Sequence, residues 1–420
     1  MIYDLVVCGG GPAGASAAWR AASAGARVLV VDKAKFPRDK PCGDGLTPRA
    51  VASIGALGLE NELKAFNRVE KLRVNGAGRT LTFDWPASDS FPDFGYVVAR
   101  TDLDEMLLRH AEAAGAEVRE ETSAWAPIVE NDVVCGITTK RDGTTEDVRA
   151  SVVIAADGAS SRIARAVGMV RDERRPIGVA VRAHFEAKRP QRDENVIESY
   201  LELRDGDALL PGYGWIFPMG RGSSGESRIN VGVGILSSYK GWRDVNTAHL
   251  MDAFMRSLPR DWELPDISHL RSSGQLKGWR LPMGFCVREP WRPGVMAAGD
   301  AAGVVNPFNG EGISEAVESG VIAATTALKA LGGRGPSDFS VYTRSLDATW
   351  GPYYRLGRTF VRIIGNPRVM RALTVVGMRV PPVMEFAFKL LANLYRERDG
   401  GKGDALVRAM LATARVIPLG

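Results

Sequence analysis

Hydrophobic positions near the start of the chain follow first the pattern of a strand and then that of a helix. An apolar run from Leu5 to Cys8 predicts a buried strand, and the Ala-rich segment behind the following glycines has the composition of a helix. A second apolar run, RVLVVD, predicts another strand that ends at Asp32. This order of strand, glycine-rich turn, helix and strand is typical of a β-α-β unit in a parallel sheet.

Alternating patterns prevail in the middle of the chain. The segments ERRPIGVAVRAHFEA, ESYLELRD and RINVGVGIL place apolar residues at every second position, which predicts an antiparallel sheet. The stretch LPGYGWIFPMG adds Tyr213, Trp215 and Phe217 at alternate positions, so that three rings point to one face of a strand. By residue type alone, these rings fit a core strand better than a binding surface.

The C-terminal part combines helical patterning with positive charge. Between Gly351 and Gly420, 12 Lys and Arg stand against 4 Asp and Glu, interleaved with apolar residues. The pattern predicts amphipathic helices with a basic face, which fits a solvated surface and, as the alternative, contact with anionic lipid headgroups. Nucleic acid is not expected as a partner, because no groove-reading or base-stacking module accompanies the charge.

The composition is that of an ordinary globular protein: 420 residues, 45% hydrophobic and 25% charged. The scattered cysteines, Cys8, Cys42, Cys135 and Cys286, form no Cys-x-x-Cys pair, so neither a disulfide framework nor a metal site is indicated. The sequence shows no signal-peptide pattern and no apolar run near the roughly 18 residues that cross a bilayer. A cytoplasmic protein is expected, with peripheral contact at the inner face of the cell membrane as the alternative.

The first chemical motif is G-x-G-x-x-G, formed by Gly9, Gly11 and Gly14. In this motif the first glycine permits a tight turn, the second lets the backbone approach a pyrophosphate, and the third lets helix and strand pack closely. The motif therefore predicts a dinucleotide site, and by itself it does not separate FAD from NAD.

Residues around the motif complete this prediction. Pro12 and Ala13 stand where the helix is expected to begin, and its free N–H groups and positive dipole end suit a pyrophosphate. Asp32 is placed to accept hydrogen bonds from the adenosine ribose hydroxyls and argues against a 2′-phosphate. The adjacent Lys33 weakens that second argument.

A second glycine-rich region favours FAD over NAD as the cofactor. The run GVMAAGDAAGVVNPFNGEGISEAVESGVIAA resembles the second FAD signature of flavoprotein hydroxylases and their relatives, in which the aspartate of Gly299-Asp300 binds the ribityl chain. Gly310, Gly312 and Ile313 then stand at the start of a helix whose N–H groups would point at the flavin pyrimidine ring.

Two shorter motifs resemble the same superfamily. Asp157-Gly158, after the apolar run VVIAA, resembles its D-G motif, which lies close to FAD. The segment VVARTDLDEMLLRHA resembles its R-x-x-L-D segment, with Arg100 as the cofactor contact and Asp104 as a helix-start residue. Each could also be an ordinary turn or cap, but together and in this order they indicate bound FAD.

A narrower resemblance follows from three stretches taken together. FPRDKPCGDGLTPRAV, YGWIFP and GDAAGVVNPFNGEGI resemble the geranylgeranyl reductase family, and in particular its actinobacterial branch with the menaquinone reductases. The resemblance implies an α/β fold: a Rossmann-type FAD domain of the p-hydroxybenzoate hydroxylase-like superfamily, an antiparallel-sheet substrate domain and a helical C-terminal region. The chain departs from the family at Asp44, where many members read P-C-G-G-G.

The resemblance also implies a reaction. The wall formed by Tyr213, Trp215 and Phe217 would line a cavity next to the isoalloxazine and hold a polyprenyl lipid, either a geranylgeranyl group or a menaquinone side chain. The implied chemistry is saturation of an isoprene double bond by hydride from reduced FAD and a proton. Cys42 and Gly43 would lie beside the flavin, which makes Cys42 the catalytic candidate, with a small buried hydrophobe as the alternative. NADPH and a reduced carrier remain equal alternatives as electron donor.

Two other function classes fit the same fold. An FAD monooxygenase acting on an aromatic or polyketide-like substrate is the first, and a non-catalytic flavoprotein at a membrane surface is the second. Halogenases of the superfamily carry W-x-W-x-I-P, whereas this chain has Tyr213 and Phe217 at the two flanking positions. Hydroxylases often have His after G-D-A-A, where this chain has Gly303. Both differences favour the reductase.

The order of motifs predicts a discontinuous layout. The FAD domain is expected to comprise residues 1–70, 95–178 and 285–335, because the cofactor motifs fall in all three. The substrate domain would comprise 71–94 and 179–284, and a helical domain would comprise 336–420.

Overall fold

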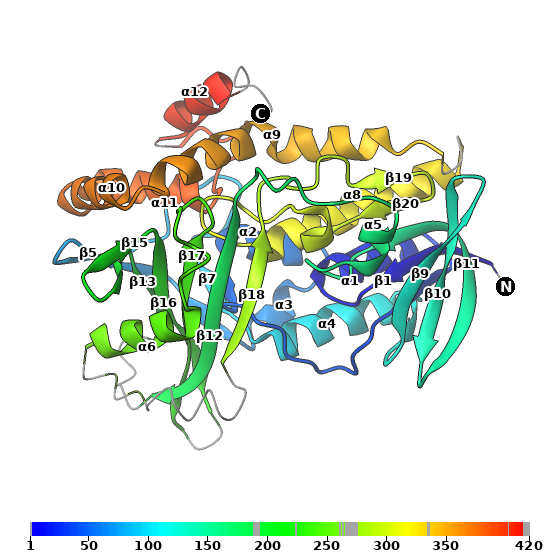
Figure 1. Ribbon diagram of the computed structural model, residues 1–420, viewed down its shortest axis with the longest axis horizontal. Helices are drawn as coiled ribbons and strands as arrows, with labels where there is room; N and C mark the ends of the chain where they lie inside the picture. Colours follow the sequence, from blue (N-terminus) through cyan, green and yellow to red (C-terminus); the bar gives the residue numbers. More distant parts are fainter. Residues whose placement is uncertain are drawn as a thin grey trace. The chain divides into compact units, whose positions relative to one another are not determined.

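The computed structural model describes residues 2–187, 194–222, 225–259, 262, 264, 276–333, 337–401 and 403–414 (Figure 1). The chain forms two compact units. Unit 1 comprises Met1–Asp39, Arg100–Arg175 and Pro282–Arg355, and unit 2 comprises Lys40–Ala99, Pro176–Leu281 and Leu356–Gly420. This division differs from the expected three domains, because residues 40–70 and most of the C-terminal helices belong to unit 2.

The centre of unit 1 is a parallel sheet. Its strands are β20 (Val295–Ala297), β11 (Thr144–Ala155), β1 (Ile2–Cys8), β2 (Val28–Val31) and β8 (Glu117–Arg119), in that spatial order. β1 pairs with β2 and β11 on its two sides, and its residues from Leu5 to Cys8 are buried, as expected of a central strand in a parallel sheet. β19 (Trp291–Arg292) adds an antiparallel edge, and β10 (Val133–Arg141) and β9 (Ser123–Glu130) continue from the first half of β11.

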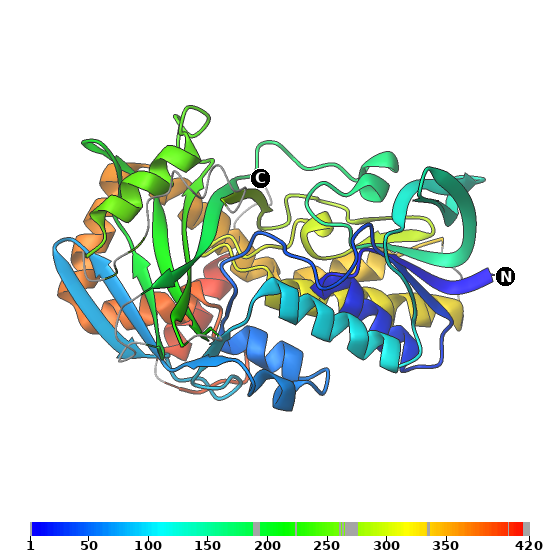
Figure 2. The ribbon, with the colours of Figure 1, turned by 90° about the horizontal axis from the view of Figure 1, so that it is seen from below.

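Small residues let two helices of unit 1 pack against each other. α1 (Pro12–Ala22) lies beside α8 (Ile313–Leu331) (Figure 2). α1 is rich in alanine, and α8 carries Gly320 at the contact. A Cβ atom on Gly320 would lie 2.1 Å from the carbonyl oxygen of Ala13, and Ser16 donates a 3.1 Å hydrogen bond to the carbonyl of Val317. At this contact the backbones of the two helices approach each other closely. Unit 1 also contains α4 (Arg100–Ala113), α5 (Arg162–Ala166), the 3-10 helix η3 (Gly299–Ala302) and most of α9 (Ser340–Ile364).

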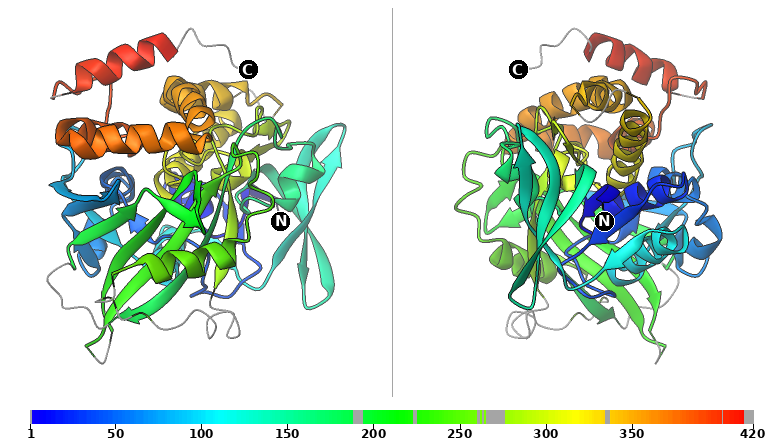
Figure 3. Two further views of the ribbon diagram at one scale, coloured as in Figure 1. Left: turned by 60° about the vertical axis from the view of Figure 1, so that its left-hand side comes forward. Right: turned by 90° about the vertical axis from the view of Figure 1, so that its right-hand side faces the viewer.

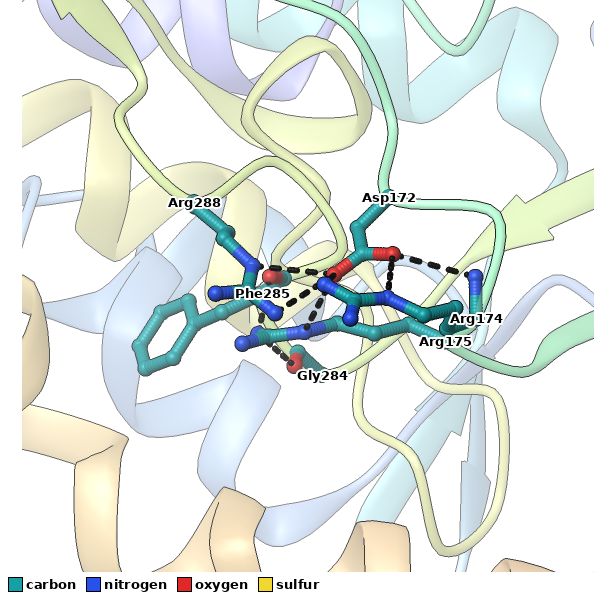
Figure 4. A network of polar contacts seen from close by, with 6 residues as sticks. All are labelled: Asp172, Arg174, Arg175, Gly284, Phe285 and Arg288. Carbon is teal, nitrogen blue, oxygen red and sulfur yellow. Dashed lines mark hydrogen bonds and ion pairs between the residues drawn. The ribbon is translucent and has the colours of Figure 1, made fainter. Parts of the chain in front are cut away.

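A carboxylate in unit 1 joins two segments that are distant in sequence (Figure 4). Asp172 accepts hydrogen bonds from the side chain of Arg174 at 3.1 Å and from the Nε and Nη2 atoms of Arg288 at 2.9 and 2.8 Å. Arg175 donates to the carbonyl oxygens of Gly284 and Phe285. The hydrogen bonds from the side chain and backbone of Arg174, followed by that from Arg288, hold the pKa of Asp172 well below its ordinary value.

We expect Asp172→Asn to lower the Tm by about 2–4 °C, because the amide keeps the size of the side chain and loses its charge. A depressed folded-state pKa contributes stability above the unfolded-state pKa of about 3.9, and this contribution is lost as the pH falls toward the folded-state value. The Tm difference from the wild type should therefore be equal at pH 6 and pH 8 in thermal denaturation, and should shrink only below about pH 4. Asp142→Asn, at a side chain that is 92% exposed, is the control. A difference that grows on acidification would contradict the prediction.

The larger sheet of unit 2 is mostly antiparallel (Figures 1 and 3). Its strands, in spatial order, are β18 (Lys277–Pro282), β12 (Ile177–Ala187), β17 (Ser227–Leu236), β16 (Gly212–Arg221), β13 (Val196–Tyr200), β5 (Lys71–Gly76) and β6 (Arg79–Asp84). One face packs on α6 (Thr247–Ser257), where Ile216, Val233 and Phe254 belong to one apolar core. Alternate residues of the same strands lie on the opposite face, which carries the aromatic residues described below.

Further elements of unit 2 surround this sheet. A small sheet contains β3 (Gly45–Leu46), β7 (Gly95–Val97) and β4 (Asn67–Val69), and β14 (Leu203–Asp205) pairs with β15 (Ala208–Leu210). The helices are α2 (Pro48–Gly55), α3 (Glu60–Leu63), α10 (Pro367–Arg379), α11 (Pro381–Leu391) and α12 (Asp404–Ala414). Met378 and Met384 pack with Val74 of β5, which fixes α10 and α11 to the sheet. The predicted fold class, α/β with an antiparallel sheet and C-terminal helices, is confirmed.

Candidate functional site

The glycine-rich turn of unit 1 follows β1 directly. Gly9 has a φ of +104°, and a Cβ atom there would lie 2.5 Å from the carbonyl oxygen of Ala156. A Cβ atom on Gly14 would lie 1.8 Å from the carbonyl oxygen of Gly9, so no other residue fits at this crossing of turn and helix. These two glycines bring the N-terminus of α1, at Pro12, against the end of β1.

Gly11 differs from Gly9 and Gly14, because a side chain at Gly11 would face a charged group instead of backbone atoms. Among the described residues other than its chain neighbours, the atom within 4 Å of a Cβ there is Nη2 of Arg38, at 3.3 Å. Nη1 of Arg38 lies 2.8 Å from the buried Asp104, which also accepts two 2.7 Å hydrogen bonds from Arg100. One carboxylate thus faces two guanidinium groups, and the excess positive charge beside a helix N-terminus suits an anionic pyrophosphate.

Asp104 is the fifth residue of α4, which begins at Arg100. The prediction that it starts the helix is therefore wrong: its carboxylate instead orients two arginines. Arg38 was not predicted from the sequence, although it lies in the basic segment KFPRDK after the second strand.

Asp32 follows β2, where the sequence places it, and is 8% exposed. Its carboxylate oxygens accept 2.8 Å hydrogen bonds from the N–H groups of Gly10 and Ala34, which fix its orientation at the turn. Each carboxylate oxygen has further lone pairs, so binding a ribose hydroxyl stays a prediction that fits this geometry. Lys33 is exposed.

The second glycine-rich region lies against the first. A Cβ atom on Gly299 would lie 2.8 Å from the Cβ of Ala13 in α1 and 3.5 Å from the Cβ of Ala316 in α8. Gly312 is the N-cap of α8, which begins at Ile313, and its Cβ would lie 3.7 Å from Oδ1 of Asp300. Gly310, with a φ of +79°, forms the turn before this helix. The first turns of α1 and α8 therefore lie on either side of Gly299.

Asp157 and Gly158 follow β11 and turn the chain toward α5. Asp157 accepts hydrogen bonds from the hydroxyl of Ser161 and, at 2.8 Å, from the N–H of Arg162. Ser161 is the N-cap of α5. The alternative of an ordinary cap thus accounts for the contacts of Asp157, and its contact with the cofactor stays a prediction.

Taken together, these features fit FAD. Two helix N-termini present free N–H groups and positive dipole ends, as a pyrophosphate and an electron-rich flavin require. Glycines leave the turn open at Gly11 and at Gly312, and Arg38 and Arg100 add positive charge near the first of these turns.

The candidate substrate surface lies in unit 2, on the face of the large sheet opposite α6. Tyr213, Trp215 and Phe217 point to this face, and the ring centroids of neighbouring residues are 5.8 and 6.2 Å apart. Gly232 pairs with Trp215 across the sheet, and Gly234 pairs with Tyr213. A Cβ atom on Gly232 would lie 2.1 Å from Cζ2 of Trp215, so the indole lies flat over the glycine. Gly232 and Gly234, in the segment NVGVG, thus form the part of the sheet on which the aromatic rings lie, and we call these two residues the glycine floor.

The loop with Cys42 packs onto the same face. Cε2 of Phe217 lies within 3.3 Å of the Cβ positions built on Gly43 and Gly45, so the ring contacts the loop backbone. The carbonyl oxygen of Cys42 accepts hydrogen bonds from Asn230 at 2.8 Å and Arg182 at 3.3 Å. Cys42 and the predicted aromatic residues therefore belong to one surface.

Polar side chains connect this loop to Trp215 on the aromatic face. Trp215 donates from Nε1 to Oδ1 of Asn230 at 2.9 Å, and Asn230 donates from Nδ2 to Oδ2 of Asp44 at 2.8 Å. The same carboxylate oxygen lies 2.6 Å from Nε2 of His184. We refer to Asp44, His184 and Asn230 as the polar triad. The sequence analysis missed His184 and Asn230, although each is a polar residue at an inward position of an alternating apolar strand.

Cys8 and Cys286 fit structural roles better than Cys42 does, because both are buried. Burial and, secondarily, the charge of Asp157 raise the pKa of the Cys8 thiol, and burial raises the pKa of Cys286 to about 12. Both thiols therefore stay protonated at neutral pH. Cys42 is partly exposed, in keeping with its place on the candidate substrate surface.

Two searches of the described residues gave negative results. Within the ranges given above, no group of three or more His, Cys, Asp or Glu side chains is arranged to hold a metal ion. Among the helices that the structure describes, none combines the length and apolar character needed to span a bilayer.

The parallel sheet, the paired helix N-termini and the glycine-rich turns define an FAD-binding flavoprotein. The chain belongs to the family described as FAD binding domain, whose model matches residues 3–342. Menaquinone reductase of Mycobacterium tuberculosis is 38% identical over 398 residues, which cover 94% of this chain and 92% of the relative. Digeranylgeranylglycerophospholipid reductase 1 of Methanopyrus kandleri is 30% identical over 334 residues, with coverages of 79% and 82%. The predicted resemblance to geranylgeranyl and menaquinone reductases is confirmed.

Solved structures share the fold over nearly the whole chain. A geranylgeranyl bacteriochlorophyll reductase-like protein from Thermoplasma acidophilum has a TM-score of 0.77 at 24% identity and covers 97% of this chain and 99% of its own. A flavin-dependent brominase has a TM-score of 0.69 at 20% identity, with 99% of each chain covered. At these identities the two structures show the fold alone.

Proposed function

We propose that the protein is an FAD-dependent reductase that saturates carbon-carbon double bonds of isoprene units in a polyprenyl lipid, with a geranylgeranyl group or a menaquinone side chain as substrate. The observation that carries this proposal is the aromatic face over the glycine floor of unit 2, together with the similarity to prenyl reductases over 94% of the chain.

The aromatic face suits an isoprene chain because its rings are flat, rigid and apolar. Burial of a polyprenyl segment contributes about 25 cal/mol per Å² of apolar surface. Tyr213, Trp215 and Phe217 lose little rotamer entropy on binding, and Trp215 is already fixed by its hydrogen bond to Asn230. The side chains that would orient the lipid are thus already ordered before it binds.

The protein must also supply what the cofactor does not. Reduced FAD, when bound by the turns of unit 1, supplies the hydride. An isoprene alkene has no carbonyl to polarise, so side chains must hold the double bond, exclude water and deliver a proton. Cys42 remains the predicted residue near the flavin, and NADPH and a reduced carrier remain the alternative electron donors.

Gly303 argues against the alternative of an aromatic monooxygenase. It has a φ of +69°, and a Cβ there would lie 2.6 Å from Sγ of Cys286 and 3.0 Å from the N atom of Val287. A histidine, which hydroxylases often carry at this position, has no room here. This restriction supports the reductase.

An anaerobic reaction tests the proposed function. The purified protein is loaded with FAD, reduced with dithionite and mixed with menaquinone or geranylgeranyl diphosphate, while flavin absorbance and product mass are followed. We expect reoxidation of the flavin and a gain of two hydrogens per turnover. A lack of reaction with both lipids, with product gaining 16 mass units when oxygen and an aromatic substrate are admitted, would favour the monooxygenase. Flavin that no donor reduces would favour a binding protein.

We further propose that α10 and α11 contact an anionic lipid surface, from which the substrate would be taken. Leu373, Val376, Val380 and Val383 are 44–53% exposed. Leu373 and Val376 lie on one side of α10, and Val380 is the C-cap of this helix. The opposite side of α10 packs on the sheet through Met378. Exposed Arg368, Arg371 and Arg379 accompany this apolar strip, as in helices that lie at a membrane interface.

Leu373→Glu combined with Val376→Glu should weaken binding to vesicles of mixed phosphatidylglycerol and phosphatidylcholine by about tenfold or more, because it removes apolar contact and adds negative charge. Co-sedimentation measures the bound fraction. Leu406→Glu, at a 54% exposed position of α12 outside the strip, is the matched control and should bind as the wild type does. Equal vesicle binding by the double variant and the control would refute this surface.

A further inference from the structure

The polar triad places a carboxylate where the backbone favours glycine. Asp44 has a φ of +62°, a conformation that costs an L-residue about 1 kcal/mol or more. Its side chain is fully buried. Backbone geometry therefore does not account for an aspartate here, and the carboxylate itself needs an explanation.

The buried carboxylate is in hydrogen-bond contact with two side chains, and the guanidinium of Arg182 binds the backbone of the same loop at Lys40 and Cys42. Oδ2 contacts Asn230 and His184, whereas Oδ1 has no hydrogen-bond partner among the described residues. An amide is neutral, so the full compensation of a buried negative charge requires a positive partner. The imidazole ring, 2.6 Å away, provides it when both of its nitrogens carry protons.

His184 has one ring edge directed at Asp44 and another left for a different partner. All the hydrogen bonds of its ring to described residues are made through Nε2. The side chain is 31% exposed, so the ring is neither sealed in the core nor fully solvated. Nδ1 is thus the nitrogen that can give a proton to a bound molecule, while Nε2 stays on Asp44.

The sheet register puts this ring on the substrate surface. His184 of β12 pairs with Asn230 of β17, and Asn230 pairs with Phe217 of β16. Directly paired residues share one face of a sheet, so His184, Asn230 and Phe217 form one row across the face with the aromatic rings. Arg182 and Trp215 belong to the next row, on either side of Gly232.

We propose that His184, held by Asp44, is the acid that protonates the isoprene double bond; this inference rests on the proposed function. Reduced FAD, when bound, would supply a hydride to one alkene carbon, and the π electron pair would form a C–H bond at the other carbon with the proton that leaves Nδ1 of His184. The ring is left neutral, Asp44 keeps its charge, and solvent reprotonates the ring at its exposed edge. Asp44 and Asn230 act as positioning residues.

The test uses the FAD-loaded protein in the anaerobic reaction. His184→Gln keeps a hydrogen-bond donor near Asp44 but is no acid, and should slow lipid-dependent flavin reoxidation by about 100-fold or more. His184→Ala should be equally slow and should regain at least tenfold when imidazole buffer is added, but not with sodium chloride of equal ionic strength. His249→Gln is the control, because His249 contacts Asp205 at 3.0 Å in an exposed pair of the same chemistry.

Measurements other than turnover separate an acid from a structural residue. We expect both His184 variants to retain stoichiometric FAD and a Tm within about 3 °C of the wild type. The solvent deuterium isotope effect on reoxidation should rise in His184→Gln, because proton transfer then limits the rate. Asp44→Asn, which keeps the side-chain size, should be slowed by at least tenfold and should not respond to imidazole.

The outcomes are distinct. Reoxidation of His184→Gln within threefold of the wild type, or slow His184→Ala without imidazole rescue, would overturn the assignment and leave Cys42 or water as the donor. Should the wild-type protein fail to reduce either lipid, the proposed function falls and this inference falls with it.

Discussion

Gly14→Ala should give a protein in which unit 1 does not fold and FAD is not retained. A methyl group would lie 1.8 Å from the carbonyl oxygen of Gly9 and 3.1 Å from Cγ1 of Val7, and backbone atoms cannot give way as a flexible side chain does. The expected loss of unfolding free energy is about 3 kcal/mol or more. Circular dichroism, thermal denaturation and the flavin absorbance of the purified protein measure this outcome.

Gly11→Ala separates loss of the cofactor from loss of the fold. Gly11 has a φ of −74°, which alanine adopts, and its Cβ would meet only the end of the Arg38 side chain. The apoprotein should therefore keep its secondary structure and Tm, while FAD binds about 100-fold more weakly because a methyl group holds the pyrophosphate away from the backbone N–H groups. Gly400→Ala, with no atom within 4 Å, is the control. Unchanged FAD affinity in Gly11→Ala would show that the pyrophosphate does not bind at this turn.

Gly232→Ala should lower kcat/KM for the polyprenyl lipid by about 100-fold while the FAD content stays that of the wild type. The added Cβ would lie 2.1, 2.5 and 2.6 Å from three atoms of the Trp215 ring, so the indole must move. Its hydrogen bond to Asn230 would then be strained or broken, and displacements of about 1 Å in a reactive site cost about 100-fold in rate.

A graded comparison makes this prediction specific. At Gly234, two residues along the same face, a Cβ would have its nearest contact at 3.7 Å, which is an ordinary van der Waals distance. Gly234→Ala should therefore lose less than about fivefold in kcat/KM. Equal losses in the two variants, or loss of FAD from Gly232→Ala, would contradict the assignment of the aromatic face to the lipid.

Local sequence patterns were sufficient to predict the elements of the candidate cofactor site. Gly9, Gly14 and Asp32 lie in the structure at the turn, the helix crossing and the strand end that their spacing indicates, because a β-α-β unit is specified by residues close together in sequence. The alternation of Tyr213, Trp215 and Phe217 likewise placed three rings on one face, since the period of a strand is two.

The polar triad could not be predicted, because it depends on register. Asp44, His184 and Asn230 come from a loop and two strands, and only the pairing of β12 with β17 brings the latter two together. Arg38 was missed for a similar reason, since its partner Asp104 lies far along the chain in α4. Alternation indicates which face a side chain takes, but it does not indicate which residue lies opposite.

The division of the chain between two units has a consequence for its synthesis. Each unit is assembled from three separate stretches, and the last stretch of unit 1 begins only at Pro282. β1 is synthesised before its neighbour β11, which follows more than a hundred residues later, and β20, which pairs with β11, comes later still. One edge of β1 must therefore wait unpaired during translation, which favours chaperone binding and slow folding. No fragment made by a single cut contains all of one unit and none of the other, so unit 1 cannot be produced alone by simple truncation.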